Sequence, residues 1–264
     1  MPITNMTNAY SLEGKNAVIT GGSKGIGFGI ATAFAQQGAN LAILGRDEVT
    51  GNKVAADLAA EYGVKAAFYK ADMSDTASCK SAVESIVADF KEINILVNNA
   101  GVGTNGNFLD MDDDMSNYFH CVNVDMNGVA RMTFFVAKHM KETGKGGKIV
   151  NISSNAGDMA SRAIGMSAYC TAKAGVNQFT RAVGLELAPY GIQMNAIAPG
   201  YTYSNLFNGM PEEQIAGIAK GMPTGRLGTP IEIGALAVYL ASPAADQVVG
   251  TIVTIDGGHS LGIF

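Results

Sequence analysis

The sequence is poor in cysteine, which argues against a fold held together by disulfides or by a structural zinc site. Its three cysteines, Cys79, Cys121 and Cys170, are widely spaced and form no CxxC pair. An odd, scattered set of this kind predicts reduced thiols in a cytoplasmic protein and argues against a disulfide framework or a zinc site. Cys170 directly follows Tyr169, and we interpret it as a small packing residue.

Histidines, basic clusters and long apolar runs are also scarce. The three histidines are scattered without metal-ligand spacing, so no metal site is predicted. The net charge is −5 and no block of lysine or arginine occurs, which argues against nucleic acid or a membrane surface as a partner. No apolar run reaches ~18 residues and no secretory pattern is visible, so neither a membrane span nor secretion is expected.

What the sequence does contain is an alternation of short apolar runs with longer helical segments. Apolar residues make up 47% of its 264 residues, enough for a sizeable core. Strands that are apolar throughout and separated by helices indicate a parallel sheet covered on both faces. The sequence predicts one doubly wound α/β domain over residues 1–264, with a flexible arm over residues 1–11. The expected strands span residues 17–20, 40–44, 65–70, 93–99, 148–153, 192–198 and 251–256.

The segments between these strands have the periodicity of helices. Three of them end at Gly38, Gly63 and Gly191, as helices with C-terminal glycine caps do. A long helix is expected over residues 115–141. In a doubly wound sheet, ligands bind beyond the carboxyl ends of the strands, so the functional residues should follow each strand.

The first strand runs into a glycine-rich turn, TGGSKGIG, at residues 20–27. Its glycines allow the backbone to turn tightly and to approach a pyrophosphate at the start of the next helix. The alternative is a tight strand-to-helix turn without a ligand. A Walker A loop is excluded because no GK[ST] follows. The expected cofactor contacts in this turn are Gly21, Ser23, Lys24, Gly25, Ile26 and Gly27.

The second strand is followed by Arg46, where enzymes that choose NAD usually place an acid for the ribose 2′-hydroxyl. Arg46 and Lys24 instead suit a 2′-phosphate, because arginine can hold it with two hydrogen bonds. We therefore expect NADP(H). NAD(H) is the alternative, because a small backbone shift would bring Asp47 to the ribose. The two cations are also compatible with solvated surface charges.

The third and fourth strands end in short polar or small residues. Asp72 and Met73 follow the third strand, where the carboxylate can accept from the amine of adenine; a helix-capping acid is the alternative. Asn99, Ala100 and Gly101 follow the fourth, where small residues permit close approach to a ribose and amides can join strand ends. A role in the turn alone is the other interpretation.

The fifth strand is followed by a loop and then by a helix that carries Tyr169 and Lys173. Residues four apart lie on one helical face. A cation a few Å from a phenol lowers its pKa of ~10 by roughly one to three units, which brings it within range of neutral pH. Ser154 ends the strand, and its hydroxyl is expected to face the same cleft. Taken alone, Tyr-x-x-x-Lys is also compatible with an ordinary amphipathic helix.

Together and in order, these motifs resemble the short-chain dehydrogenase/reductase family from about residue 12 to residue 258. The resemblance implies a seven-stranded Rossmann-type fold, a nicotinamide cofactor, and a hydride exchanged with a carbonyl or secondary alcohol. It implies that Tyr169 is the general acid/base, that Lys173 lowers its pKa and binds the nicotinamide ribose, and that Ser154 holds the substrate oxygen. Asn123 matches the helix asparagine that positions a water in a proton relay through Lys173. The segment expected to hold the nicotinamide carboxamide contains Pro199, Gly200, Thr202 and Ser204, the last standing where the family more often has threonine.

The loop between Ser154 and Tyr169 is about two residues longer than in many family members. Similar spacing in some polyol and sugar dehydrogenases favours a hydroxylated substrate. The pocket walls are expected from residues 102–107, 155–167 and 201–226. The last segment is rich in glycine, methionine and tyrosine, which suits either a lid or packing against a neighbouring subunit.

The predicted function is that of an NADP(H)-dependent oxidoreductase acting on a small-molecule alcohol or carbonyl. The alternatives are an NAD-dependent dehydrogenase of a steroid, hydroxy acid or 3-oxoacyl substrate, a nucleotide-sensing protein without turnover, and a methyltransferase. A sensor needs only the glycine turn and ribose contacts, so the tyrosine–lysine pair favours an enzyme. Similar enzymes are commonly homotetramers or dimers built on the helices expected over 115–141 and 167–189.

Overall fold

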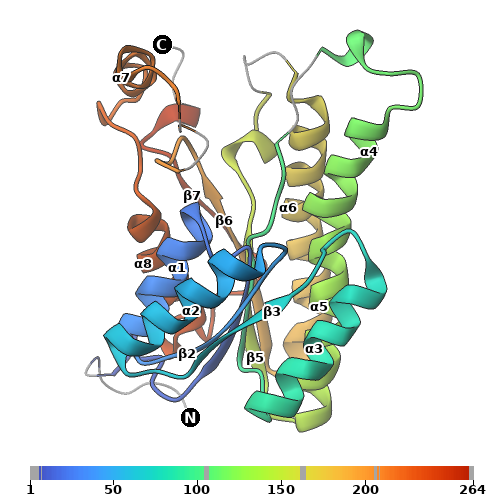
Figure 1. Ribbon diagram of the computed structural model, residues 1–264, viewed down its shortest axis with the longest axis vertical. Helices are drawn as coiled ribbons and strands as arrows, with labels where there is room; N and C mark the ends of the chain where they lie inside the picture. Colours follow the sequence, from blue (N-terminus) through green and yellow to red (C-terminus); the bar gives the residue numbers. More distant parts are fainter. Residues whose placement is uncertain are drawn as a thin grey trace.

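Seven short strands form one parallel sheet in the order β3-β2-β1-β4-β5-β6-β7 (Figure 1). The computed structural model describes residues 6, 8–103, 107–160, 165–204, 207 and 209–261. Helices cover both faces of the sheet, which confirms the predicted doubly wound Rossmann-type fold. Each of the seven predicted strands is present. The strands are β1 (Asn16–Thr20), β2 (Asn40–Gly45), β3 (Ala66–Lys70), β4 (Ile95–Asn98), β5 (Gly147–Ile152), β6 (Ile192–Pro199) and β7 (Ile252–Ile255).

The helices follow the predicted order, with two differences. The long helix expected over residues 115–141 is interrupted by a π-helical turn at Asn123–Asn127. The segment 201–226, expected as a lid or as packing against a neighbouring subunit, contains α7. The predicted glycine cap of α2 is confirmed, since Gly63 has a φ angle of 68°. Gly191, with φ 71°, caps the 3₁₀ turn Ala188–Tyr190 that follows α6, and Gly38 lies one residue beyond Gln37, the C-cap of α1. The α-helices are α1 (Gly25–Gln36), α2 (Glu48–Tyr62), α3 (Thr76–Phe90), α4 (Ser116–Val122), α5 (Gly128–Thr143), α6 (Ser167–Leu187), α7 (Glu212–Lys220) and α8 (Pro230–Ala241).

The core consists of two apolar layers, one on each face of the sheet. Successive strand residues point to opposite faces, so Ile19 packs with α1, α2 and α8, whereas its neighbour Val18 packs with α3 and α5. Because both faces are covered, the central strands have no solvent-facing side and are mostly apolar, which is why they could be recognised from sequence.

A buried chain of amides and hydroxyls ties the central strands to two helices. The Asn98 amide donates to Asn151 Oδ1 at 2.8 Å and to Thr133 Oγ1 at 3.0 Å, and the Asn151 amide donates to Thr180 Oγ1 at 2.9 Å. These bonds link β4 and β5 to α5 and α6. They therefore fix α6, which carries Tyr169 and Lys173, against the sheet.

The N-terminal segment corrects part of the prediction of a flexible arm over residues 1–11. Residues 1–5 and 7 lie outside the described residues. From Asn8 onward the chain is anchored: Ala9 is buried and its carbonyl accepts from the Ala244 amide at 3.1 Å, and the ring of Tyr10 lies 6.3 Å from that of Tyr239. Residues 8–11 are thus part of the packed structure.

The N-terminus of α8 is closed by a capping box between Thr229 and Glu232, which Arg226 reinforces. The Glu232 carboxylate accepts from the Thr229 amide at 2.8 Å and from Arg226 Nη2 at 2.6 Å. Arg226 and the Thr229 amide hold the pKa of Glu232 at about 2. Since α8 packs closely against α1, this cap supports the helix pair that borders the glycine-rich turn.

Glu232→Ala should lower the free energy of unfolding at neutral pH by about 1 kcal/mol, because it removes the side-chain half of the capping box and leaves the Thr229 amide and the Arg226 guanidinium without their carboxylate partner. The pKa of Glu232 is lower in the folded state, so this contribution is present above its ordinary pKa of 4.5 and fades as pH falls toward about 2. Urea denaturation near neutral and near acid pH measures the difference. Glu84→Ala, at an exposed pair with Lys80, is the control and should change stability little.

Candidate active site

The glycine-rich turn lies between the end of β1 and the start of α1, and side chains are excluded from it. A Cβ on Gly27 would lie 2.5 Å from the Asn99 amide nitrogen and would overlap the Gly21 carbonyl oxygen. No side chain caps α1, whereas Asp47 and Asp75 cap α2 and α3. The open backbone and the uncapped amides at the start of α1 fit the pyrophosphate of a dinucleotide.

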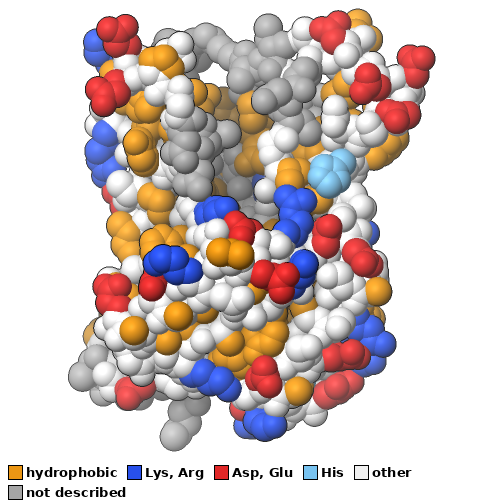
Figure 2. Space-filling model, viewed as in Figure 1, with side chains coloured by type: hydrophobic (Ala, Val, Ile, Leu, Met, Phe, Trp, Pro, Cys, Tyr) orange, Lys and Arg blue, Asp and Glu red, His pale blue; other side chains and the backbone are white. Residues whose placement is uncertain are grey.

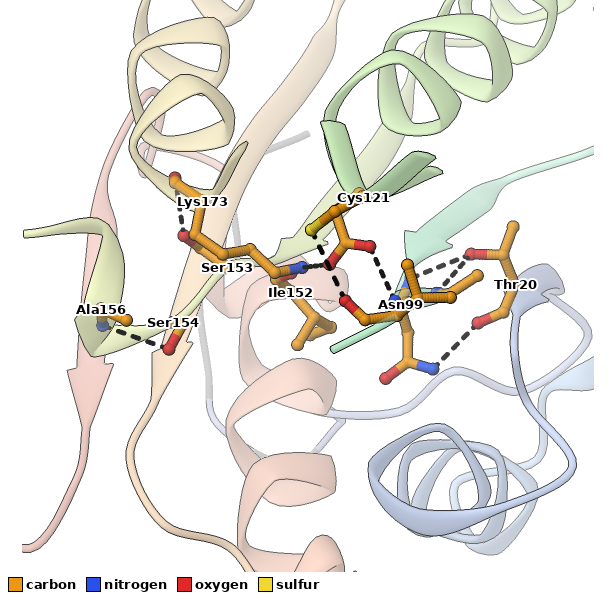
Figure 3. A network of polar contacts seen from close by, with 11 residues as sticks. Thr20, Asn99, Cys121, Ile152, Ser153, Ser154, Ala156 and Lys173 are labelled. Atoms are coloured by element: carbon orange, nitrogen blue, oxygen red, sulfur yellow. Dashed lines mark hydrogen bonds and ion pairs between the residues drawn. The ribbon is translucent and has the colours of Figure 1, made fainter. Parts of the chain in front are cut away.

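Asn99 and Ala100 hold this turn in place from the end of β4. The Asn99 amide donates to the carbonyl oxygens of Thr20 and Gly21 at 3.0 and 3.2 Å. The backbone amides of Asn99 and Ala100 both donate to Thr20 Oγ1, at 2.9 and 3.0 Å (Figure 3). The expectation that amides join adjacent strand ends is confirmed here, while contact with a ribose stays a prediction.

Three charged side chains lie near the end of β2, namely Arg46, Asp47 and Lys24, and they differ in whether they are already paired. Asp47 caps α2, because one carboxylate oxygen accepts from the Thr50 backbone amide at 3.1 Å. Its other oxygen accepts from Thr50 Oγ1 at 2.6 Å and from Lys24 Nζ at 2.9 Å. These contacts, Thr50 first, hold the pKa of Asp47 far below its usual range. Arg46 is exposed and makes no hydrogen bond or ion pair with the described residues. The arrangement keeps the carboxylate occupied and presents the guanidinium to solvent.

Asp72 forms a local turn after β3, and Asp75 is the cap of α3. One Asp72 oxygen accepts from the Ser74 amide at 2.8 Å and from the Ser74 hydroxyl at 2.7 Å, which lowers its pKa. The helix-capping alternative for Asp72 is therefore wrong. Its neighbour Met73 is buried and packs against Gly128, where a Cβ would lie 2.9 Å from the methionine Cβ.

Tyr169 and Lys173 lie together at the carboxyl end of β5, where Ser154 follows the strand. Lys173 Nζ lies 5.4 Å from the centroid of the Tyr169 ring. The same nitrogen donates to the Ile152 carbonyl at 3.2 Å (Figure 3). Ser154 Oγ accepts from the Ala156 amide at 3.1 Å. Ser153 Oγ instead donates to the Lys173 carbonyl at 3.2 Å, so it is turned toward α6. This supports the choice of Ser154 over Ser153.

Asn123 does not lie where the sequence prediction placed it. Its side-chain oxygen accepts from Arg131 Nη2 at 2.7 Å, and its amide donates to the Ser74 carbonyl at 3.3 Å. The side chain thus faces α3 and α5, away from Lys173. Two residues later, Asp125 places its carboxylate 3.2 Å from Lys173 Nζ. The role assigned to Asn123 is therefore corrected: Asp125 is the residue of this helix that contacts Lys173.

Asp125 is the main functional candidate that the sequence analysis missed. It is completely buried, and its other oxygen accepts from the Val102 amide at 2.7 Å. A Cβ on Gly101 would lie 2.7 Å from the Asp125 carboxylate, so glycine is needed for this approach. A signal was available, because an acid between the apolar residues Val124 and Met126 is unusual unless it has a partner.

The segment after β6 lies against the glycine-rich turn. The Ser204 Cβ is 3.4 Å from the position of a Cβ on Gly25. A Cβ on Gly200 would lie 2.5 Å from Asp256 Cβ, and Thr202 forms an isolated parallel bridge with Gly228. Pro199 ends β6. The structure therefore brings residues 199–204 to the same edge of the sheet as the glycine turn. Of the predicted pocket walls, residues 104–106, 161–164, 205–206 and 208 lie outside the described residues.

A second polar cluster borders Ser154 and was also missed. The Asn155 amide lies 3.2 Å from Asp256 Oδ2 and 3.3 Å from His259 Nδ1, and the His259 ring contacts the Tyr201 ring at 5.4 Å. These residues come from three segments that are far apart in sequence, so only the fold reveals their proximity. They form one wall beside the tyrosine–serine pair.

The surface above the carboxyl ends of the strands is hollowed, with lysine and arginine side chains at the lower rim of the hollow (Figure 2). A cavity of about 760 Å³ lies at the opposite edge of the sheet, lined by Lys15, Lys148 and Asp246 among others. We place the site at the carboxyl edge, because the tyrosine, lysine, serine and glycine turn meet there.

Within the described part of the chain, no cluster of histidine, cysteine or acidic residues could hold a metal ion, and no helix could cross a membrane.

Comparison with known proteins agrees with this geometry. The family model described as enoyl-(acyl carrier protein) reductase matches residues 21–260. The chain is 40% identical over 259 residues to oxidoreductase UcpA of Salmonella typhimurium, covering 95% of this chain and 96% of that protein. It is 33% identical over 262 residues to a sorbitol dehydrogenase of Cereibacter sphaeroides, covering 94% and 98%. A solved short-chain type dehydrogenase/reductase from Mycobacterium marinum is 32% identical, with a TM-score of 0.91 over 97% of this chain and 99% of that one.

Proposed function

The chain belongs to the short-chain dehydrogenase/reductase family of oxidoreductases, and we propose that it transfers a hydride between NADP(H) and the carbonyl or secondary alcohol of a small molecule. The observation that carries the proposal is the position of Tyr169 beside the buried Lys173, at the carboxyl end of β5 where Ser154 follows the strand, and at the same sheet edge as the glycine turn. A nucleotide sensor or a methyltransferase has no use for this set. We propose that residues 1–264 act as one cofactor-binding and catalytic domain.

The residues around the glycine turn fit a dinucleotide. The pyrophosphate would be held by the amides at residues 21–27, where a Cβ has no room at Gly27. Asp72, Asn99 and Gly101 would contact the adenosine and ribose, and residues 199–204 the nicotinamide. When bound, the nicotinamide supplies or accepts the hydride.

The protein's own groups would manage the proton and the charge on the substrate oxygen. In reduction, the Tyr169 hydroxyl donates a proton to the carbonyl oxygen, while the Ser154 hydroxyl donates a hydrogen bond to the same oxygen. Lys173 favours the phenolate that remains on Tyr169. In oxidation of an alcohol the phenolate takes the proton back, so the same groups serve both directions.

A polyol or sugar is the substrate class that we favour. The long Ser154–Tyr169 loop and the likeness to a sorbitol dehydrogenase support it. The polar wall of Asn155, Asp256 and His259 beside Ser154 offers donors and acceptors to additional hydroxyl groups. The description of the matching family model keeps an acyl-thioester substrate as the competing class.

We also propose a cytoplasmic homo-oligomer. Large apolar side chains are exposed on α4, α5 and α6: Phe119 at 59%, Phe134 at 63% and Leu185 at 75%. A second copy of the chain would cover them. Size-exclusion chromatography with light scattering tests this part, and a monomer at micromolar concentration would contradict it.

The experiment that tests the function is a substrate panel. Purified protein is mixed with NADPH or NADH and with ketoses, keto acids, 3-oxoacyl thioesters, steroids and small ketones, and the absorbance of the reduced nicotinamide is followed. We expect turnover with NADPH and at least one ketose. The same panel run in the oxidative direction with polyols should show the reverse reaction. Absence of turnover across the panel in both directions would count against the proposal.

Arg46→Asp should move the cofactor preference from NADP toward NAD. The change removes the guanidinium proposed for the 2′-phosphate and supplies an acceptor for a ribose hydroxyl. We expect the ratio of kcat/KM for NADPH over NADH to fall by about 10²-fold, which corresponds to the loss of a charge-assisted pair. Lys53→Asp, at an exposed α2 position paired with Asp57, is the matched control and should leave the ratio unchanged. A ratio unaltered by Arg46→Asp would contradict the assignment.

A further inference from the structure

Asp125 and Lys173 form an ion pair that is almost completely shielded from water. The two side chains are 0% and 5% exposed, and the carboxylate oxygen lies 3.2 Å from the ammonium nitrogen. The pair lies beneath Tyr169, between the π-helical turn and α6. Through this ion pair, the π-helical turn that precedes α5 contacts Lys173, one of the proposed catalytic residues.

The surroundings of the pair are built to hold a carboxylate at this place. The Val102 amide donates to one Asp125 oxygen at 2.7 Å, and Gly101 leaves room for the other. The π-helical turn at Asn123–Asn127 shifts the helical phase where Asp125 projects inward. One Asp125 oxygen thus has a hydrogen bond from the backbone, and the other has the Lys173 ammonium as its charge partner but no hydrogen bond.

Apart from Asp125, few groups around Lys173 favour its charged ammonium form. Burial disfavours its ammonium form, and its other contact is the Ile152 carbonyl at 3.2 Å. The titratable groups that face it are Asp125 from the π-helical turn, Tyr169 from its own helix and Cys121 from α4. Asp158, on the loop side of α6, is bonded to the Asn177 amide instead. Burial and Asp125 act in opposite directions, and the net pKa of Lys173 is raised.

We propose that Asp125 is a positioning residue, the counter-ion that keeps Lys173 charged and fixed beneath Tyr169. The proposal deepens the proposed function and rests on it for its catalytic meaning. A charged Lys173 is what favours the Tyr169 phenolate, so Asp125 acts on the proton transfer through the lysine. An asparagine at this place would leave the cation without a compensating charge.

The test measures stability and needs no turnover. Asp125→Asn keeps the side-chain shape and removes the charge. Without it, the pKa of the buried Lys173 falls below its unfolded value of ~10.4, so the unfolded state binds more protons and stability rises with pH. We expect the folding equilibrium constant of Asp125→Asn, from urea denaturation, to rise by up to about tenfold per pH unit between about pH 7 and about pH 9 relative to wild type.

Two further variants make every outcome decisive. Adding Lys173→Met to Asp125→Asn should abolish the extra slope, and Asp158→Asn should keep the wild-type slope. If Asp125→Asn fails to fold at neutral pH, the double variant should restore folding. An Asp125→Asn protein with the wild-type slope, or an unfolded one that Lys173→Met does not restore, would overturn the proposal. Because no activity is measured, these outcomes are independent of whether the panel of carbonyls is reduced.

Discussion

Tyr169→Phe should lower kcat by about 10² to 10⁴-fold with any carbonyl substrate that the protein accepts. The change removes one hydroxyl, and with it the proton donor for the substrate oxygen, a contribution of this size in general acid catalysis. The ring that packs near Lys173 stays, so NADPH should bind with a dissociation constant within a few-fold of the wild-type value. Steady-state kinetics and fluorescence titration of NADPH separate the two effects.

The matched control is Tyr190→Phe. Tyr190 also carries a hydroxyl near a lysine, 3.1 Å from Lys141 Nζ, but it lies on the surface after α6. Its loss should leave kcat unchanged. A Tyr169→Phe protein that turns over at the wild-type rate would remove Tyr169 from the mechanism.

Lys173→Met should lower both activity and stability. Loss of the cation removes the charge that favours the Tyr169 phenolate, and we expect activity at neutral pH to fall by about 10 to 10³-fold. It also leaves the Asp125 carboxylate buried without its counter-ion, and breaking a buried pair in this way costs about 3–5 kcal/mol. Protonation of Asp125 relieves part of this cost.

The loss of stability in Lys173→Met should depend on pH in one direction. In Lys173→Met the Asp125 carboxylate is buried without its cation, so the folded state takes up a proton more readily than the unfolded state and stability falls as pH rises above ~4. Urea denaturation near pH 5 and near pH 8 should therefore give a larger loss at the higher pH. Lys138→Met, at an exposed α5 position, is the control. Equal losses at both pH values would show that Asp125 is not left charged.

The fold could be predicted because its strands are mostly apolar and its turns carry glycine. Runs such as residues 41–44 are apolar on both faces, as a sheet covered on both sides requires, and the polar exceptions, such as Asn151, are buried in hydrogen-bonded pairs. The glycine turn and the Tyr169–Lys173 spacing follow from local geometry, since both depend on residues close together in the chain. These features account for the sheet and for the part of the site formed by β1, β5 and α6.

Asp125 shows what the family resemblance obscured. The asparagine at 123 matched a motif by residue type, but the buried stripe of this helical segment runs through Cys121, Asp125 and Gly128 and does not include Asn123. Helical phase would have placed the acid on the inner face. The π-helical turn, which sets its direction, has no clear sequence signature.

The other features that the sequence did not predict depend either on tertiary contacts or on a segment of unusual composition. The wall of Asn155, Asp256 and His259 joins segments about a hundred residues apart, which periodicity does not connect. The helix α7 lies in a segment rich in glycine and methionine; its acidic first turn and Lys220 in the last turn were usable signals. The identity of the substrate depends on loops whose side-chain positions are determined by tertiary contacts of this kind.

The most direct test of the account follows the hydride itself. NADPH carrying deuterium at the transferable position of the nicotinamide is incubated with the protein and the ketose that gives the fastest turnover in the panel, or with the whole ketose set. We predict a product alcohol that carries one deuterium on the carbinol carbon, detected by mass spectrometry, and about 10² to 10⁴-fold slower formation of the same labelled alcohol in Tyr169→Phe. An alcohol without deuterium, or oxidation of NADPH without an alcohol product, would contradict the claim that this site transfers a hydride to a carbonyl.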